Sequence, residues 1–120
     1  MMHQAAKVYL GVVRATIVVP GARTLKQRRA VVRSLCDRIR SRFSVSLHLL
    51  PGPEHPGRQD IVVTTGGGER SVVERSIREV QRFLETAPES HLGGLDVECF
   101  GWHPPAERDV DAYLWEGADE

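Results

Sequence analysis

Hydrophobic and polar residues follow six successive patterns along the chain, and their order predicts the fold. Residues 8–19, 45–50, 60–65 and 95–100 are β-branched or alternate between apolar and polar positions, as strands do. Residues 24–43 and the segment after Gly68 instead repeat apolar residues at the three-and-four spacing of one helical face. Strand, helix, strand, strand, helix, strand is the split βαβ order. We therefore expect an α+β, ferredoxin-like βαββαβ domain: a four-stranded antiparallel sheet with two helices on one face.

Short polar signals are expected to set the ends of these elements. Thr24 with Gln27, and Ser71 with Glu74, have the spacing of a capping box, so a helix should begin at each pair. Residues 91–94, which include two glycines, are expected to form a turn before the last strand.

The first helix is strongly basic. Residues 23–42 contain eight of the 16 Lys and Arg residues of the chain and a single acid, Asp37. On a helical wheel, one flank of the apolar stripe contains Lys26, Arg29, Arg33 and Arg40, and the other contains Arg28 and Arg42. Arg28 falls near the apolar face, so its stem should cover the core while its guanidinium reaches water. A solvated face is one explanation of this array, but so many like charges repel each other unless a partner compensates them.

The formal net charge of zero conceals a separation of charge along the chain. Residues 104–120 contain six acids and one base, so an acidic tail balances the basic helix. We expect two parts, a ferredoxin-like domain over residues 1–103 and this tail over residues 104–120. Within the tail, Tyr113-Leu114-Trp115 is a compact apolar anchor. The anchor either docks on an apolar surface and brings the acids towards the basic helix, or belongs to a disordered, solubilising tail.

Several function classes find little support in the sequence. No segment is long and apolar enough to span a membrane and there is no cleavable signal pattern, so we expect a cytoplasmic protein with no membrane partner. Cys36 and Cys99 fall on apolar faces, which is typical of reduced core residues. The five histidines are scattered without ligand spacing, and no metal site or cofactor is expected.

Catalytic chemistry is not expected either. Gly66-Gly67-Gly68 before a helix is a candidate phosphate cradle, but it lacks the Lys-Ser/Thr of a P-loop and the spacing of a dinucleotide fingerprint. A flexible turn is the better interpretation. Glu54-His55 has no nucleophile or orienting group nearby in the sequence. No catalytic residue is therefore assigned, and the chain is not expected to be an enzyme.

The first strand presents an apolar patch on its face away from the helices. Its members are Val8, Leu10, Val12 and Val18. A monomer should not leave such a patch in water, so we expect a homodimer formed across the sheets. Arg14 lies on the same face and should sit near Asp96 or Glu98 of the neighbouring strand.

RNA binding, if present, should use the basic helix rather than the sheet. Residues 61–65, the third strand, contain no aromatic side chain on which a base can stack. Contacts to phosphates would be sensitive to salt and nearly independent of the RNA sequence. The residues expected to make them are Arg23, Lys26, Arg29, Arg33 and Arg40.

Several residue groups in the first half of the chain resemble the YlxP-like family of small bacterial proteins of unknown function. They are Gly11 and Arg14, Pro20-Gly21-Ala22-Arg23, Leu25-Lys26, Arg28-Arg29 and Phe43-Ser44-Val45-Ser46. The resemblance covers about residues 8–100 and implies a ferredoxin-like fold. The genes of the family often lie beside those for translation initiation and ribosome maturation factors, which implies a role near the ribosome. Relatives usually have an acidic, Trp- and Gln-containing loop before the third strand, whereas this chain has Glu54-His55-Pro56-Gly57-Arg58, without an aromatic.

Together these patterns favour a non-enzymatic domain that binds structured RNA or a ribosome-assembly particle through its basic helix. The alternative is a homodimeric interaction or regulatory module without a nucleic-acid role, whose arginines pair with acids of its own chain or of a partner.

Overall fold

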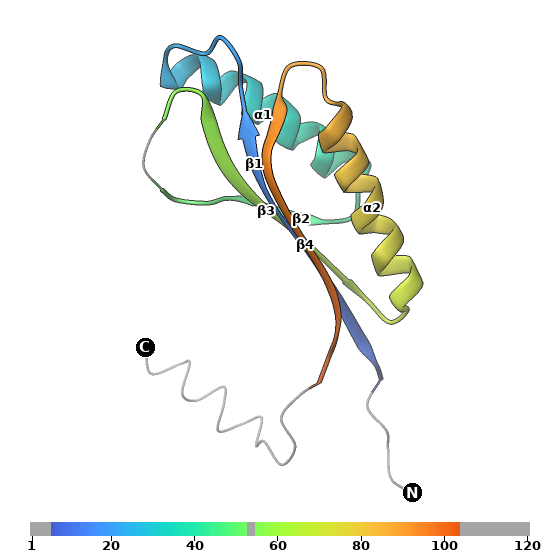
Figure 1. The fold of residues 1–120 in the computed structure, drawn as a ribbon. Helices are drawn as coiled ribbons and strands as arrows, with labels where there is room; N and C mark the ends of the chain where they lie inside the picture. The colour runs from blue at the N-terminus through green and yellow to red at the C-terminus, as the bar shows by residue number, and fades with distance from the viewer. Residues whose placement is uncertain (1–5, 53–54, 104–120) are drawn as a thin grey trace, which may run out of the picture.

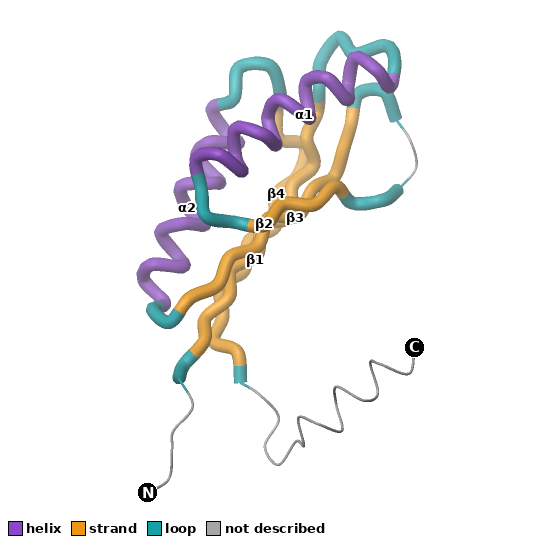
Figure 2. The backbone as a smooth tube through the Cα atoms, turned by 180° about the vertical axis from the view of Figure 1, so that it is seen from behind, coloured by secondary structure: helices purple, strands orange, loops and turns teal. Residues whose placement is uncertain are grey.

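The computed structural model describes residues 6–52 and 55–103 of the 120-residue chain. The elements are β1 (Val8–Val18), α1 (Leu25–Arg42), β2 (Ser46–Leu49), β3 (Arg58–Gly67), α2 (Arg70–Thr86) and β4 (His91–Trp102). The four strands form one antiparallel sheet in the order β2-β3-β1-β4. Both helices lie on the same face of this sheet (Figures 1 and 2). The predicted ferredoxin-like βαββαβ fold is confirmed.

The core lies between the sheet and the apolar stripes of the two helices. It comprises Val13, Ala15 and Ile17 of β1, Ile61 and Val63 of β3, Val32, Leu35 and Ile39 of α1, and Ile77, Val80 and Leu84 of α2. A glycine in β1 allows α2 to pack closely, because a Cβ at Gly11 would lie 2.5 Å from Cγ1 of Ile77. The helical stripes predicted from the sequence are therefore the buried faces.

The two helices begin differently. Thr24 caps α1 as predicted: its hydroxyl accepts from the Gln27 N–H at 3.1 Å, and Oε1 of Gln27 accepts from the Thr24 N–H at 3.2 Å. The predicted Ser71-Glu74 box is wrong, because the N-cap of α2 is Glu69, two residues before Ser71, and Glu69 makes no side-chain capping bond. The Glu74 carboxylate instead accepts from Nε of Arg70 at 2.8 Å, four residues back on the helix.

The last strand is longer than the sequence predicted. Residues 91–94 belong to β4 rather than to a turn, so this prediction is wrong. The pairing of β4 with β1 shifts register opposite Thr16 and Ile17, because Gly93 is an extra residue in β4. A Cβ at Gly93 would lie 2.7 Å from Cγ2 of Val18, so glycine here allows a bulge against β1.

No helix among the described residues is long and apolar enough to cross a membrane. Both cysteines are free thiols. Residues 104–120, including the Tyr113-Leu114-Trp115 anchor, lie outside the described residues.

Candidate nucleic-acid interface

A groove runs along α1, between this helix and the chain that connects β2 to β3. It encloses about 530 Å³ and combines an apolar floor with a basic rim. Its lining comprises Val32, Cys36, Leu49, Leu50, Pro51 and Gln59 together with Arg28, Arg29, Arg33 and Arg40. Val32 and Cys36 are buried, whereas Leu49 is 53% exposed. We call this feature the α1 groove.

Three of the five predicted RNA contacts meet at the α1 groove. Arg29, Arg33 and Arg40 line it, and each is exposed. Arg23 and Lys26 are also exposed but precede this lining in the chain. Among the described residues, no acid lies within 4 Å of the side chains of Arg23, Lys26 or Arg33.

Arg40 combines its place at the groove with a structural role. Its Nη2 donates to the backbone carbonyl of Leu47 in β2 at 2.9 Å. Its Nη1 lies 3.8 Å from the Asp37 carboxylate, one helical turn earlier. These contacts hold the guanidinium beside the edge strand, so Arg40 is less available to a phosphate than Arg33.

Arg28 departs from the sequence prediction. Its side chain does not reach water: only 5% of the residue is exposed, and Nη1 donates to the carbonyls of His55 at 2.8 Å and Arg58 at 3.2 Å. Nε is also buried and has no hydrogen-bond partner among the described residues. The expectation is wrong because the turn before β3 closes over the first turn of α1. Arg28 thus anchors this turn to the helix.

The C-terminal end of α1 contacts α2 through aromatic rings and arginines. The rings of Phe43 and Phe83 meet edge to face, with centroids 5.8 Å apart. The guanidinium carbon of Arg42 lies 5.2 Å from the Phe83 centroid, and that of Arg38 lies 5.7 Å from it. At such distances a cation is attracted to the ring face. These two arginines therefore stabilise the contact between the helices.

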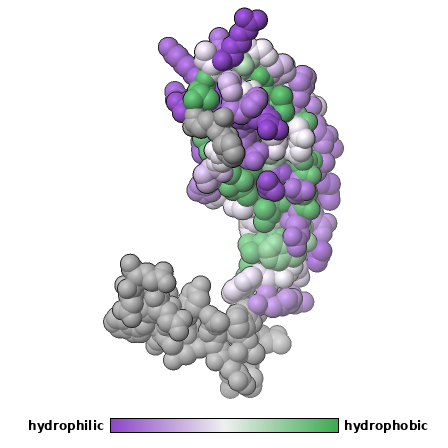
Figure 3. All heavy atoms as spheres, turned by 60° about the vertical axis from the view of Figure 1, so that its left-hand side comes forward, coloured by the Kyte–Doolittle hydropathy of each residue, from purple (hydrophilic) through white to green (hydrophobic). Residues whose placement is uncertain are grey.

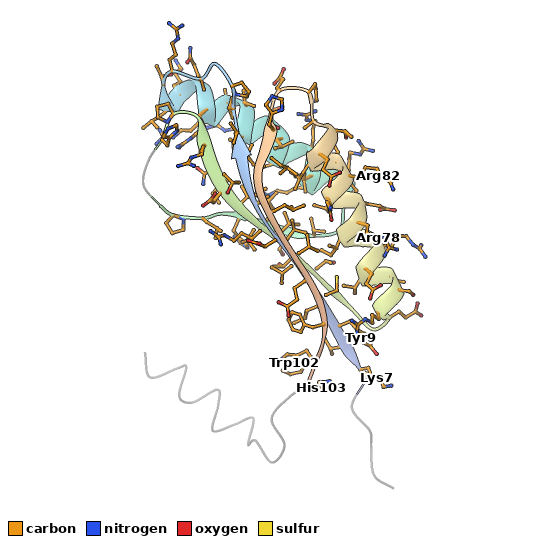
Figure 4. All side chains as sticks on the ribbon, in the orientation of Figure 1. Lys7, Tyr9, Arg78, Arg82, Trp102 and His103 are labelled. Carbon is orange, nitrogen blue, oxygen red and sulfur yellow. The ribbon has the colours of Figure 1, made fainter. Side chains whose placement is uncertain are left out.

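The charges of α2 are more evenly balanced than those of α1. Its four arginines share the helix with three glutamates. The Glu74 carboxylate contacts Arg70 at 2.8 Å and Arg78 at 3.9 Å. Arg78 and Arg82 project from α2 on the side away from the sheet (Figure 4). The excess of positive charge on the helical layer therefore belongs mainly to α1.

The open face of the sheet contains the predicted apolar patch. Val8, Leu10, Val12 and Val18 are all partly buried there. The pairing of β1 with β4 adds two aromatic residues to this patch that were not predicted to belong to it. Phe100 lies opposite Leu10, and Trp102, which is 47% exposed, lies opposite Val8. Figure 3 shows hydrophobic residues gathered in the middle and lower parts of the face that it views.

A polar group lies beside this apolar patch. Nη1 of Arg14 lies 3.8 Å from the Asp96 carboxylate, and Nη2 lies 4.0 Å from that of Asp60. The Thr16 hydroxyl donates to Asp60 at 2.6 Å. Arg14 thus contacts the first of its two predicted partners, within its own chain. The open face is therefore partly apolar and partly charged.

A second hollow lies where β1 begins and β4 ends. Lys7, Tyr9, Trp102 and His103 lie together at this end of the sheet (Figure 4). With Arg70 they line a cavity of about 410 Å³. The sequence prediction missed it because the last strand was expected to end at Phe100. The signal was the apolar and aromatic alternation that continues to Trp102.

Comparison with known proteins gives a family. A model of the DUF503 family, described as a protein of unknown function, matches residues 10–97. The chain belongs to this family. No curated protein matches the sequence.

Two solved structures are similar to this DUF503 chain in fold. The de novo designed protein Foldit4 is 19% identical with a TM-score of 0.48, and the match covers 82% of this chain and 99% of that one. SnoaB, a cofactor-independent oxygenase from Streptomyces nogalater, is 12% identical with a TM-score of 0.42, covering 86% and 100%. Likenesses this remote carry no argument about function.

The thiols of this DUF503 domain are not activated as nucleophiles. Burial raises the pKa of Cys36, although the nearby Arg40 opposes the rise, and burial also raises the pKa of Cys99. Both thiols are therefore protonated at neutral pH, whereas a nucleophilic cysteine needs a lowered pKa. Among the described residues, no three His, Cys, Asp or Glu side chains form a group that could hold a metal ion.

Proposed function

We propose that this DUF503 domain is a non-enzymatic module that binds structured RNA, free or within a ribosome-assembly particle, through the basic flank of α1. The observation that carries the proposal is the meeting of Arg29, Arg33 and Arg40 at one groove of the folded chain. Phosphate contacts from Lys and Arg supply most of the sequence-independent affinity for nucleic acids. The resemblance to YlxP-like proteins, and the place near the ribosome that it implies, agree with this function.

The charge of the domain supports a polyanionic partner. Residues 1–103 contain 15 Lys and Arg residues against ten Asp and Glu residues. Within α1 and its caps, seven Lys and Arg residues accompany a single acid. A positive field centred on one exposed helix raises the rate at which a polyanion encounters that surface.

Charge reversal on this flank should remove RNA binding. We expect Lys26→Glu, Arg29→Glu and Arg33→Glu together to weaken binding at least about 100-fold at low salt. Each lost phosphate contact should also reduce the slope of log K against log salt by about 0.7 to 0.9. Arg40 is left intact because its bond to the Leu47 carbonyl stabilises the fold. Fluorescence anisotropy with a labelled RNA hairpin measures the affinity.

A matched control places the same charge change on α2. Arg75→Glu, Arg78→Glu and Arg82→Glu alter the net charge equally, but on the other helix. This variant should lose much less affinity, and thermal melting should show that both variants are folded. Equal losses in the two variants, or a hairpin that binds at neither low nor high salt, would contradict the proposal.

A second candidate function is a homodimeric interaction or regulatory module without a nucleic-acid role. It is favoured by the apolar patch on the open face, where Leu10 and Phe100 are only partly buried and Trp102 is 47% exposed. Large exposed apolar patches are typical of interaction sites. A second copy of the same face would cover this patch and remove it from water.

The oligomeric state tests this candidate directly. We expect light scattering at micromolar concentration to give twice the 13.4 kDa mass of the chain. Leu10→Asp should give the monomer mass, because a carboxylate at a closed apolar interface loses its hydration. Val72→Asp alters an exposed apolar residue of α2 and should remain dimeric. A monomeric wild-type protein would contradict the interface.

A further inference from the structure

We propose that the α1 groove accommodates one unpaired nucleotide of an RNA, with its base on the apolar floor and its flanking phosphates on the arginine rim. This inference rests on the proposed function and deepens it. It predicts that the domain prefers loops, bulges or single strands to continuous duplex. The groove volume of about 530 Å³ lies within the usual range of about 300–1,000 Å³ for small-ligand sites.

The floor of the groove indicates a ligand that is more than a phosphate. Leu49 is 53% exposed, and it lies in the groove with Leu50 and Pro51 above the buried Val32 and Cys36. Apolar side chains give a hydrated phosphate no favourable contact. A nucleobase has two apolar faces, which bury such a surface and remove it from water. Bases in a continuous duplex are stacked inside and cannot reach this floor.

Arg28 fixes one part of the groove lining in place. It lines the α1 groove, its Nε is buried, and this N–H has no acceptor among the described residues. The two bonds from Nη1 to the carbonyls of His55 and Arg58 fix the guanidinium in place.

The rim provides charge along the length of the groove. Arg29 and Arg33 lie one helical turn apart, and Arg40 lies two turns further on. At about 1.5 Å per residue, the distance from Arg29 to Arg40 along the axis is about 16 Å. This length allows contacts to the phosphates on both sides of one inserted nucleotide. Guanidinium planes also stack on bases.

The opposite wall is held in position by hydrogen bonds. Nε2 of Gln59 donates to the carbonyls of Leu50 at 3.1 Å and Asp60 at 2.8 Å. The Leu50 N–H donates to the Asp60 carbonyl at 2.9 Å. The groove is therefore formed before a ligand binds, which reduces the entropy lost on binding.

Three matched ligands separate base recognition from charge. Fluorescence anisotropy would compare a labelled 12-nucleotide single-stranded RNA, a blunt RNA duplex of the same length and an abasic 12-mer with the same phosphodiester backbone. We expect the single strand to bind at least about tenfold more tightly than the other two. Leu49→Ser should weaken single-strand binding about fivefold to tenfold, leave the abasic oligomer unchanged and preserve the salt slope. Val72→Ser, at a similarly exposed position on α2, should change nothing.

Crosslinking on the wild-type chain tests the location without a variant. Trypsin cuts after Lys and Arg, so residues 43–58 form one peptide that contains Leu49, Leu50 and Pro51. RNA with 4-thiouridine should crosslink to this peptide. Crosslinks confined to other peptides would overturn the groove as the base site, whatever the stability of the Leu49 variant.

The possible failures are distinguishable. If none of the three oligomers binds at low salt, both the proposed function and the groove site are wrong. If all three bind equally and Leu49→Ser is silent, the phosphate contacts stand and the base site is wrong. If poly-glutamate displaces the single strand as well as unlabelled RNA does, the groove recognises acidic chains in general, and the nucleotide proposal is overturned.

Discussion

Arg28→Met should lower the free energy of unfolding by about 3 kcal/mol, the largest loss expected among substitutions of the basic residues of α1. The substitution keeps the buried alkyl stem but removes the donors to the carbonyls of His55 and Arg58. Hydrogen bonds from a charged group contribute about 1.5–3 kcal/mol each, and carbonyls left unpaired in a buried site add to the loss. The removal of the unpartnered Nε offsets part of this sum. Urea unfolding followed by circular dichroism measures the change.

Arg33→Met is the matched control, because it makes the same replacement at an exposed position of the same helix. It should change stability by no more than about 0.5 kcal/mol. Equal stabilities of the two variants would show that Arg28 does not hold the turn before β3.

Removal of residues 104–120 should strengthen RNA binding about tenfold at low salt and much less at physiological salt. The deletion removes six acids and one base and changes the formal net charge from zero to +5. The Debye length is about 30 Å at 0.01 M salt and about 8 Å at 0.15 M, so repulsion between tail and RNA acts further at low salt. Anisotropy with the same labelled RNA at both salt concentrations gives the comparison.

The control for this experiment keeps the length of the tail and changes its charge. Replacing its six acids by Asn and Gln should reproduce the effect of the deletion, because the repulsion between tail and RNA is electrostatic. A deletion that leaves affinity unchanged at both salt concentrations would mean that the tail does not restrain binding.

Docking of the apolar anchor has its own optical test. Trp102 is already 47% exposed, so Trp115 must be observed in a Trp102→Phe background. If the anchor docks, Leu114→Asp should shift the Trp115 emission to the red. Emission that is already that of a hydrated indole, and that does not shift, would favour the solubilising tail.

The fold was predictable because each element has a pattern that depends on its own residues. The apolar spacing and the Thr24 capping box of α1 are local, and the structure confirms both. The start of β4 was missed because glycines mark turns and bulges alike, and Gly93 serves a bulge. The Ser71-Glu74 box failed for a related reason: its spacing is common inside helices, where Glu74 pairs with Arg70.

The candidate site was only half predictable. The arginine rim follows from helix geometry, which places Arg29, Arg33 and Arg40 on one flank. The floor includes Leu49, Leu50 and Pro51 of another element, and their approach to α1 depends on tertiary packing. The partners of Arg28 lie 27 and 30 residues away, in a turn that has no periodic signal. A basic residue on an apolar face signals an unusual environment, but it does not name the acceptor.

Arg40 also blocks part of one edge of the sheet to strand addition. The Leu50 N–H donates to the Asp60 carbonyl in β3. Successive residues of a strand direct their backbone groups to opposite sides, so those of Leu47, three positions earlier, point away from β3. The Leu47 carbonyl accepts a hydrogen bond from Arg40 there. Unpaired carbonyls on an edge strand are templates for aggregation, and β2 is further limited by its four-residue length. The 12-residue β4 forms the opposite edge. Any fibril-like stacking of this protein should therefore start along β4.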